Sequence, residues 1–244
     1  MKLRRNSAPA IGFQRTTIPE FSRHMGFVAR DLGSIAIVVL IALAGVGVLA
    51  AASLPYLPLI HGSTADEIAR LAAWLDVQAG TRVADLGAGD GTFAVALARV
   101  VGPSGHVYAT ELDDGRLAGI RQAAVEAGVY NITAIRGAVT STRLPEACCD
   151  AVFSRAAYHH LTNAAAINAD LFRALRPGGR LVIIDFEPGG FIDWIGRPET
   201  ADRHGGHGTP RETVVREVTA AGFQVLRAPE PWRGRTYGTL FRRP

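Results

Sequence analysis

Residues 82–98 of this 244-residue chain read RVADLGAGDGTFAVALA, and this stretch decides the fold. The apolar run at residues 83–86 predicts a buried strand, and the dense apolar positions after the glycines predict a buried helix. Between them, Gly87, Gly89 and Gly91 occupy alternate positions. Glycine permits positive φ and removes the side chain that would keep a ligand from the backbone, and a helix N-terminus offers unpaired N–H groups. The stretch therefore predicts a strand, a ligand-binding turn and a helix.

The glycine spacing and two acidic residues indicate the kind of ligand. A dinucleotide-binding turn has the pattern G-x-G-x-x-G, and Thr92 stands where that pattern needs its third glycine. Asp85, two positions before the first glycine, suits a ligand with a cationic amino-acid end. The second apolar run, residues 107–109, leads to Glu111, where a carboxylate at the strand end can accept both ribose hydroxyls. We therefore expect a nucleoside without phosphates, which disfavours a nicotinamide oxidoreductase.

Four stretches of the chain resemble, in order, the motifs of class I S-adenosylmethionine-dependent methyltransferases. They read VADLGAGDGTF, VYATEL, CDAVFSRAAYHHL and LRPGGRLVIIDF. The resemblance covers roughly residues 78–186, with a weaker likeness from residue 208 to the C-terminus. It implies an α/β fold with a doubly wound seven-stranded sheet whose last strand is antiparallel. It also implies S-adenosylmethionine as the cofactor and methyl transfer as the reaction.

The expected cofactor-binding residues follow from these motifs. They are Asp85, Gly87, Ala88, Gly89, Gly91, Glu111, Leu112, Ala138 and Ser154. Ala138 departs from the resemblance, because many members place there an acid that accepts the adenine amino group. Ser141, Thr142, a backbone carbonyl or packing against Leu112 is expected to take over this role.

The expected catalytic residues follow the fourth predicted strand, residues 150–155. They are Tyr158, His159 and His160. In an open parallel sheet, ligands bind beyond the carboxyl ends of the strands, so this segment is the natural place for the methyl acceptor. A neutral imidazole there can take the proton of the acceptor. The alternative is a turn whose three rings only pack on the next helix.

The basic character of the chain is concentrated in its first 30 residues. These contain six basic residues and one acidic residue, a charge of +5 against a total of +4 for the whole chain, which leaves about −1 for the remainder. A nucleic-acid-binding face on the rest of the chain is therefore not expected.

Residues 32–52 contain no charged side chain and predict a membrane-spanning helix. At 1.5 Å per residue this run measures about 30 Å, the thickness of the hydrocarbon core of a bilayer. A signal peptide cleaved near Ala50-Ala51-Ala52 is the alternative, although the run exceeds a usual h-region. The positive-inside rule sends the following domain out of the cytoplasm, whereas S-adenosylmethionine is made in the cytosol. We rank the need for cofactor above the charge rule, so we expect a single-pass membrane protein with its domain on the cytoplasmic face; export is the alternative.

The predicted organisation has four parts. These are a basic tail (residues 1–31), a transmembrane helix (32–53), a linker (54–62) and a methyltransferase domain (63–244). A capping box formed by Thr64 and Glu67 is expected to open the first helix of the domain. No oligomeric state is predicted.

Two further features lead to negative expectations. Adjacent Cys148 and Cys149 are not expected to bridge, and they read as small apolar residues entering a strand. The polar, glycine-rich residues 187–208 contain His204 and His207 with Asp202 nearby, but without further ligands a solvated loop is expected and no metal site.

The predicted function is a membrane-anchored S-adenosylmethionine-dependent methyltransferase. Its acceptor is expected to be a lipid-like or otherwise hydrophobic small molecule, because a membrane anchor brings the enzyme close to such compounds. The alternative is a catalytically silent, membrane-tethered module that binds the cofactor and recruits a partner.

Overall fold

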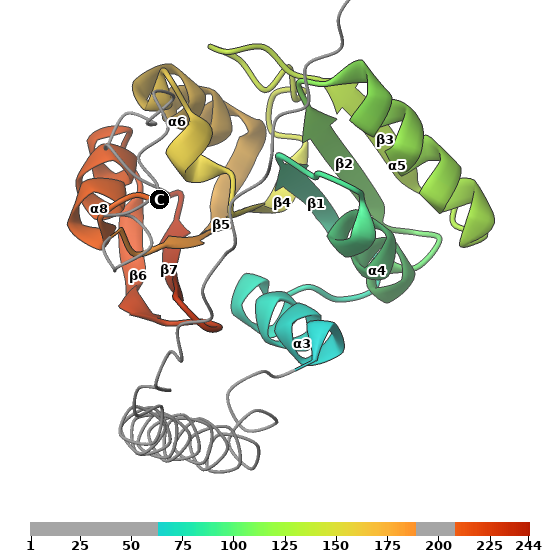
Figure 1. Ribbon diagram of the computed structural model, residues 1–244, viewed down its shortest axis with the longest axis horizontal. Helices are drawn as coiled ribbons and strands as arrows, with labels where there is room; N and C mark the ends of the chain where they lie inside the picture. Colours follow the sequence, from blue (N-terminus) through green and yellow to red (C-terminus); the bar gives the residue numbers. More distant parts are fainter. Residues whose placement is uncertain (1–62, 189–207) are drawn as a thin grey trace, which may run out of the picture. The chain divides into compact units, whose positions relative to one another are not determined.

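The structure is a computed structural model that describes residues 63–188 and 208–244. Its seven strands form one mixed sheet in the order β3-β2-β1-β4-β5-β7-β6 (Figure 1). The strands are β1 (Arg82–Leu86), β2 (His106–Glu111), β3 (Ile132–Arg136), β4 (Cys149–Arg155), β5 (Leu175–Phe186), β6 (Gln224–Pro231) and β7 (Thr236–Arg242). β7 is antiparallel to both β5 and β6, and the other neighbouring strands are parallel. The predicted seven-stranded sheet with an antiparallel last strand is confirmed.

Helices cover both faces of this sheet. They are α3 (Thr64–Leu75), α4 (Thr92–Val101), α5 (Asp114–Glu126), α6 (Ala164–Ala174) and α8 (Arg211–Ala220), with a 3-10 turn η1 (Tyr158–His160) after β4. α3, α4 and α5 contribute to the core on one face, whereas α6 and α8 form the core on the other (Figure 1). This is the doubly wound arrangement expected from the alternation of strands and helices.

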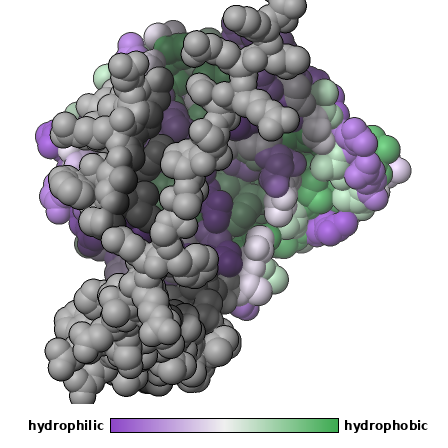
Figure 2. All heavy atoms as spheres, viewed as in Figure 1, coloured by the Kyte–Doolittle hydropathy of each residue, from purple (hydrophilic) through white to green (hydrophobic). Residues whose placement is uncertain are grey.

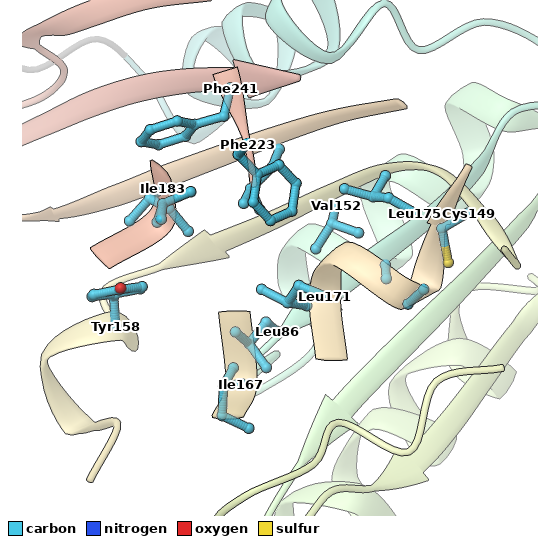
Figure 3. Close-up of a cluster of buried hydrophobic side chains, with 14 of the residues drawn as sticks. Leu86, Cys149, Val152, Tyr158, Ile167, Leu171, Leu175, Ile183, Phe223 and Phe241 are labelled. Carbon is cyan, nitrogen blue, oxygen red and sulfur yellow. The ribbon is translucent and has the colours of Figure 1, made fainter. Parts of the chain in front are cut away.

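The interior strand β5 is buried on both faces at residues 181–184, so it is apolar at consecutive positions there instead of alternate ones. Leu181 and Ile183 join the α6 and α8 core, which Figure 3 shows around Leu171 of α6. Val182 and Ile184 join the α3 and α4 core. The two cores lie on opposite faces of the sheet, and β1 and β4 are hydrogen-bonded neighbours between them.

The strand order reverses between β1 and β4, since β2 and β3 lie on one side of this pair and β5 on the other. In doubly wound sheets the ligand crevice lies beyond the carboxyl ends of the strands at this reversal. The glycine turn follows β1 and η1 follows β4, so both segments singled out in the sequence lie at the same place.

The first helix is capped one residue earlier than predicted. The Ser63 hydroxyl accepts from the Asp66 backbone N–H at 3.1 Å, and the Asp66 carboxylate accepts from the Ser63 backbone N–H at 2.7 Å. The assignment of the capping box to Thr64 and Glu67 is therefore wrong. The Glu67 side chain is only 3 % exposed and is turned toward the interior.

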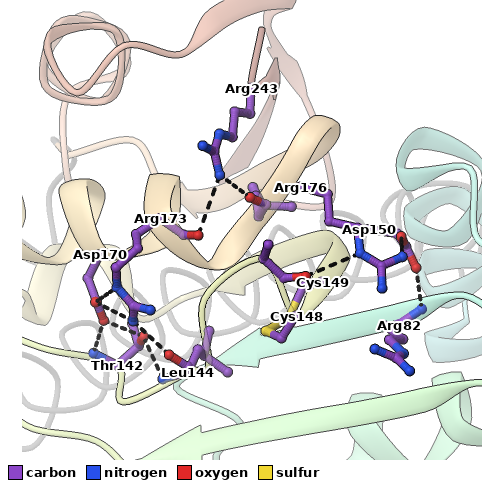
Figure 4. Close-up of a disulfide and its surroundings, with 12 residues drawn as sticks. Arg82, Thr142, Leu144, Cys148, Cys149, Asp150, Asp170, Arg173, Arg176 and Arg243 are labelled. Atoms are coloured by element: carbon purple, nitrogen blue, oxygen red, sulfur yellow. Dashed lines mark hydrogen bonds and ion pairs between the residues drawn. A yellow bond between two sulfur atoms is a disulfide. The ribbon is translucent and has the colours of Figure 1, made fainter.

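The two cysteines form a disulfide, against the prediction that they stay separate (Figure 4). The backbone around them departs from a regular strand, since Ala147 has a φ of +46° and the pairing of β4 with β5 shifts register between Cys149 and Ala151. The disulfide is buried at the start of β4 beside Asp150, whose carboxylate accepts from the Arg82 backbone N–H at 2.9 Å.

The surface of the described part carries few large exposed apolar side chains. On the edge where α5 lies, Figure 2 shows hydrophilic side chains beside hydrophobic ones. Val125 and Tyr130 are two of the exposed large side chains. β6 forms the edge of the sheet and pairs with β7 through two register shifts.

Some predictions fall on residues that the structure does not describe. These are the parts assigned to residues 1–62, including the apolar run 32–52, and the insertion with Asp202, His204 and His207. Within residues 63–188 and 208–244, none of the helices has the length and hydropathy needed to cross a bilayer. The same residues contain no group of three His, Cys, Asp or Glu side chains placed to hold a metal ion.

Candidate cofactor and acceptor site

Gly87 lets the turn after β1 pack closely on the turn after β4. Its φ is +75°, and a Cβ atom added there would lie 2.6 Å from the Cβ of Ala157. The N–H groups of Gly87 and Ala88 both donate to the Thr110 carbonyl at 3.0 Å, which ties the turn to β2. The requirement for glycine at this position therefore comes from packing between two strand ends as well as from ligand approach.

Gly89 has a different surrounding. A Cβ atom added there would meet no atom within 4 Å, and the residue lines a cavity of about 330 Å³. Its backbone N–H donates to Glu111 Oε2 at 3.1 Å. Gly91, by contrast, lines neither cavity described here; it is the N-cap of α4 and faces Ile120 of α5. Gly87 and Gly89 thus both line cavities, but only at Gly89 would an added Cβ atom meet no protein atom.

Asp85 ends in this 330 Å³ cavity, although only 2 % of the residue is exposed. Within the described residues its carboxyl group has no hydrogen-bond partner. Burial and the nearby negative charge of Glu111 raise the pKa of the Asp85 carboxyl to about 8, against the opposing influence of Arg155. A buried carboxyl that lacks a partner but faces a cavity is suited to receive a cationic group.

Glu111 lies at the end of β2, where the sequence predicts the ribose contact. Its Oε2 accepts from Gly89 N–H at 3.1 Å, and its Oε1 accepts from the backbone N–H of Leu112 at 2.8 Å. Each carboxylate oxygen can accept a further hydrogen bond. The residue also lines a second cavity of about 420 Å³, which meets the first one at Gly87. Both volumes lie within the range of about 300–1,000 Å³ that is usual for small-molecule sites.

The far end of the 420 Å³ cavity is apolar, and it is where adenine is expected. Leu112 and Val139 line it and are 53 % and 56 % exposed. Ala138 lines it too, but its backbone N–H and carbonyl are both paired with Ser141. The hydroxyls of Ser141 and Thr142 donate to Asp170 Oδ2 at 3.2 Å and 2.5 Å. Of the alternatives for holding adenine, packing against Leu112 therefore has the best geometric support.

The opposite wall of this cavity follows β4 and is mostly apolar. It consists of Ala156, Ala157, His160, Leu161, Thr162 and Ile167. Ala156 has a φ of +53°, a left-handed conformation that is costly for a residue other than glycine. Backbone strain of this kind concentrates at functional sites. This wall is suited to an apolar acceptor, with the His160 imidazole as its titratable side chain.

The three predicted catalytic residues are not brought together in one place. His160 lines the cavity, whereas Tyr158 and His159 line neither of the two cavities that the described residues form. Tyr158 is fully buried; its hydroxyl donates to Glu217 Oε2 at 3.0 Å and accepts from the Asn168 amide at 2.8 Å. This position agrees with the alternative reading, in which the ring packs on the next helix.

His159 supports His160 from beneath. Its Nδ1 lies 2.6 Å from Asp185 Oδ1 in the interior, and its ring contacts that of His160 at a centroid distance of 3.9 Å, with the two planes tilted by 46°. Ser154, predicted to contact the cofactor, is fully buried and lines neither of these cavities. The catalytic roles of Tyr158, His159 and His160 and the cofactor contact of Ser154 stay predictions.

Glu67 and Arg155 are functional candidates that the sequence interpretation missed. Arg155 lines the 330 Å³ cavity, and its Nε and Nη2 donate to Glu67 Oε1 and Oε2 at 2.7 Å and 3.1 Å. Trp232 Nε1 and Arg233 Nη1 also donate to Glu67, at 3.0 Å and 3.1 Å. Burial acts to raise the pKa of the Glu67 carboxyl, but the hydrogen bonds from Arg155, Arg233 and Trp232 and the charge of Arg155 together outweigh it and hold the pKa below its usual range. No sequence spacing joins residues 67, 155 and 233, so only the fold reveals this cluster.

This combination of strand order, glycine turn and carboxylates is that of the class I S-adenosylmethionine-dependent methyltransferases, and the chain carries a domain of this fold. Residues 84–183 match the family described as "Methyltransferase domain". The fold and this match imply S-adenosylmethionine as the cofactor. The contacts of Asp85 with its amino-acid end and of Glu111 with its ribose stay predictions.

Known proteins similar to the chain include two curated methyltransferases. The chain is 31 % identical over 111 residues to "Ubiquinone/menaquinone biosynthesis C-methyltransferase UbiE" of Pasteurella multocida, covering 45 % of this chain and 41 % of that protein. It is 27 % identical over 118 residues to "Demethylmenaquinone methyltransferase" of Listeria monocytogenes, covering 48 % of this chain and 50 % of that protein. The matches therefore span half or less of the length of these relatives.

A solved structure with the same fold is an S-adenosylmethionine-dependent methyltransferase from Aquifex aeolicus. It superposes with a TM-score of 0.62 at 20 % identity and covers 72 % of this chain and 88 % of that one. At this identity the likeness establishes the fold and leaves the acceptor open.

Proposed function

We propose that this protein is an S-adenosylmethionine-dependent methyltransferase that acts on a hydrophobic small molecule of the quinone or lipid class. The observation that carries the proposal is the pair of carboxyl groups, Asp85 and Glu111, at the ends of neighbouring strands with the Gly89 backbone between them. The apolar wall after β4 and the similarity to two quinone-related methyltransferases support the acceptor class.

The cofactor supplies a methyl group on a cationic sulfur, so the protein needs mainly to bind, align and exclude water. Asp85 holds the amino-acid end, Glu111 holds the ribose, and Leu112 packs on the adenine. The apolar wall containing Ala157 and Ile167 would seat an apolar acceptor beside the cofactor, and positioning of this kind can contribute as much as about 7–11 kcal/mol to a barrier reduction. His160, in the same wall, takes the acceptor proton at its imidazole nitrogen.

We further propose that the uncharged run of residues 32–52 anchors the protein in a membrane, with the domain on the cytoplasmic side. Its length and its lack of charge support this proposal, as does the supply of cofactor in the cytosol. Protease treatment of intact and of permeabilised cells tests it. Protection of the domain in intact cells is expected, and digestion there would favour export.

Glu111→Ala is expected to weaken binding of S-adenosylmethionine tenfold or more, because hydrogen bonds from ribose hydroxyls to a carboxylate are lost. Isothermal titration calorimetry measures the effect. Arg116→Ala is the matched control: Arg116 lines the same cavity 3.6 Å from Glu111 but is largely exposed, so a smaller change is expected. Undiminished binding by Glu111→Ala would contradict the ribose contact.

Methyl transfer itself is tested with labelled S-adenosylmethionine, purified full-length protein and extracts of membrane lipids that include demethylated quinones. Label is expected in an organic-soluble product. Labelling of water-soluble metabolites alone would contradict the hydrophobic acceptor. Cofactor binding without any labelled product would favour the catalytically silent module.

A further inference from the structure

The 330 Å³ cavity presents both signs of charge around its opening. Its lining includes the carboxyl groups of Asp85 and Asp90 and, as its cationic side chain among the described residues, Arg155. Asp85 comes from the end of β1 and Arg155 from the end of the neighbouring strand β4. A cavity with a carboxyl group and a guanidinium on adjacent strands complements a zwitterion, whose ammonium and carboxylate groups carry opposite charges.

The Arg155 guanidinium is held in place by Glu67 but keeps hydrogen-bond donors for a further partner. Two of its nitrogens, Nε and Nη2, donate to Glu67, and the guanidinium carbon lies 4.7 Å from the ring centroid of Phe93, which lines the same cavity. Within the part of the chain that the structure describes, Nη1 has no hydrogen-bond partner. The guanidinium is thus fixed at the cavity with donors left for a ligand.

Asp85 and Arg155 already influence one another electrostatically. The charge of Arg155 acts to lower the pKa of Asp85, against the dominant effect of burial. Both side chains line the same 330 Å³ cavity, so one small ligand bound there can contact both of them.

We propose that Arg155 binds the α-carboxylate of the amino-acid end of the cofactor, opposite Asp85, which binds its ammonium group. This rests on the proposed function, since the ligand is an S-adenosyl amino acid. Glu67 then acts as a positioning residue, because it fixes two nitrogens of Arg155 and leaves Nη1 for the carboxylate. The pair gives the site a preference for ligands that carry a complete amino acid over ligands that carry adenosine alone.

The test compares two ligands that share adenosine and differ at the sulfur substituent. S-adenosylhomocysteine has the amino-acid end, whereas 5′-deoxy-5′-methylthioadenosine has only a methyl group. Calorimetry of the full-length protein is expected to show that Arg155→Met weakens S-adenosylhomocysteine binding by about tenfold to hundredfold, since a charge-assisted hydrogen bond is lost. Methylthioadenosine binding is expected to stay unchanged.

Arg233→Met is the matched control, because Arg233 also donates to Glu67 but does not line the cavity. It is expected to leave the ratio of the two affinities unchanged. Thermal melting checks that each variant is folded; should Arg155→Met unfold, the ratio is measured on Arg155→Gln, which retains a donor for Glu67 and loses the charge. An unchanged ratio in the Arg155 variant, or equal losses for both ligands, overturns the proposal. Failure of the wild-type protein to bind either ligand overturns the proposed function instead.

Discussion

Asp85→Asn is expected to make the free protein more stable and to abolish most of its affinity for S-adenosylhomocysteine. The unfolded Asp85 carboxyl ionises near its ordinary pKa of 3.8, whereas in the folded protein it keeps its proton up to about pH 8. The folded state therefore loses stability through this group as the pH rises from about 4 to about 8. Each pH unit between the unfolded pKa and the pH of the experiment costs about 1.36 kcal/mol, so at pH 7 the loss of stability reaches up to about 4 kcal/mol. Asparagine does not ionise, so the Asp85→Asn variant does not have this loss.

The measurement is the free energy of unfolding in urea at pH 5 and at pH 8, where the gain from Asp85→Asn should be larger at pH 8. Asp90→Asn is the control, since Asp90 lies in the same cavity lining but is exposed. Binding is measured by calorimetry at pH 7. A decrease in stability at both pH values would contradict the raised pKa, and unchanged affinity would contradict the ammonium contact.

Calorimetry also tests the ammonium contact in a second way, by counting the protons released on binding. An arriving ammonium group favours the ionised carboxylate, so binding at pH 7 should release close to one proton from Asp85. Titrations in two buffers with different enthalpies of protonation count this proton. Asp85→Asn should release none.

Glu67→Ala is expected to destabilise the domain by about 3 kcal/mol, because it leaves the partly buried Arg155 and Arg233 without their counter-ion. The contribution of Glu67 is present above its unfolded pKa and is lost as the pH falls through its lowered folded pKa, so the effect should shrink under acidic conditions. Urea unfolding at pH 7 and at pH 3 measures it.

Asp66→Ala is the matched control for this prediction, since it removes a carboxylate from the adjacent position of the same helix. Asp66 forms the capping box with Ser63 at the surface, so a smaller loss of stability is expected. An equal or larger loss for Asp66→Ala would contradict the central role assigned to Glu67.

Much of the fold could be predicted because the local signals agree. The apolar run before Gly87, the helix after Gly91 and the carboxylate Glu111 are all local in sequence, and strand, turn and helix follow in their expected places. The capping box was misplaced by one residue because Ser63 and Thr64 both suit an N-cap and are followed three residues later by Asp66 and Glu67. The choice between the two N-caps depends on the fold, because the Glu67 side chain is buried in the interior instead of capping the helix.

The site could be predicted less completely than the fold. Asp85 and Glu111 were found because each adjoins a recognisable turn or strand end. The role of Arg155 has no local sequence signal, because its partner Glu67 is 88 residues away in sequence. The position of Tyr158 after a strand predicts a site residue, yet the 3-10 turn buries both Tyr158 and His159, and of the three residues only His160 lines the cavity.

The contacts of Glu67 with Trp232 and Arg233 join the first described helix of the domain to its last hairpin. The family match at residues 84–183 contains neither Glu67 nor the hairpin residues Trp232 and Arg233, so a fragment cut to those limits would lack these contacts. A shortened version for expression should therefore retain residues 63–75 and 224–242, which lie outside the matched range.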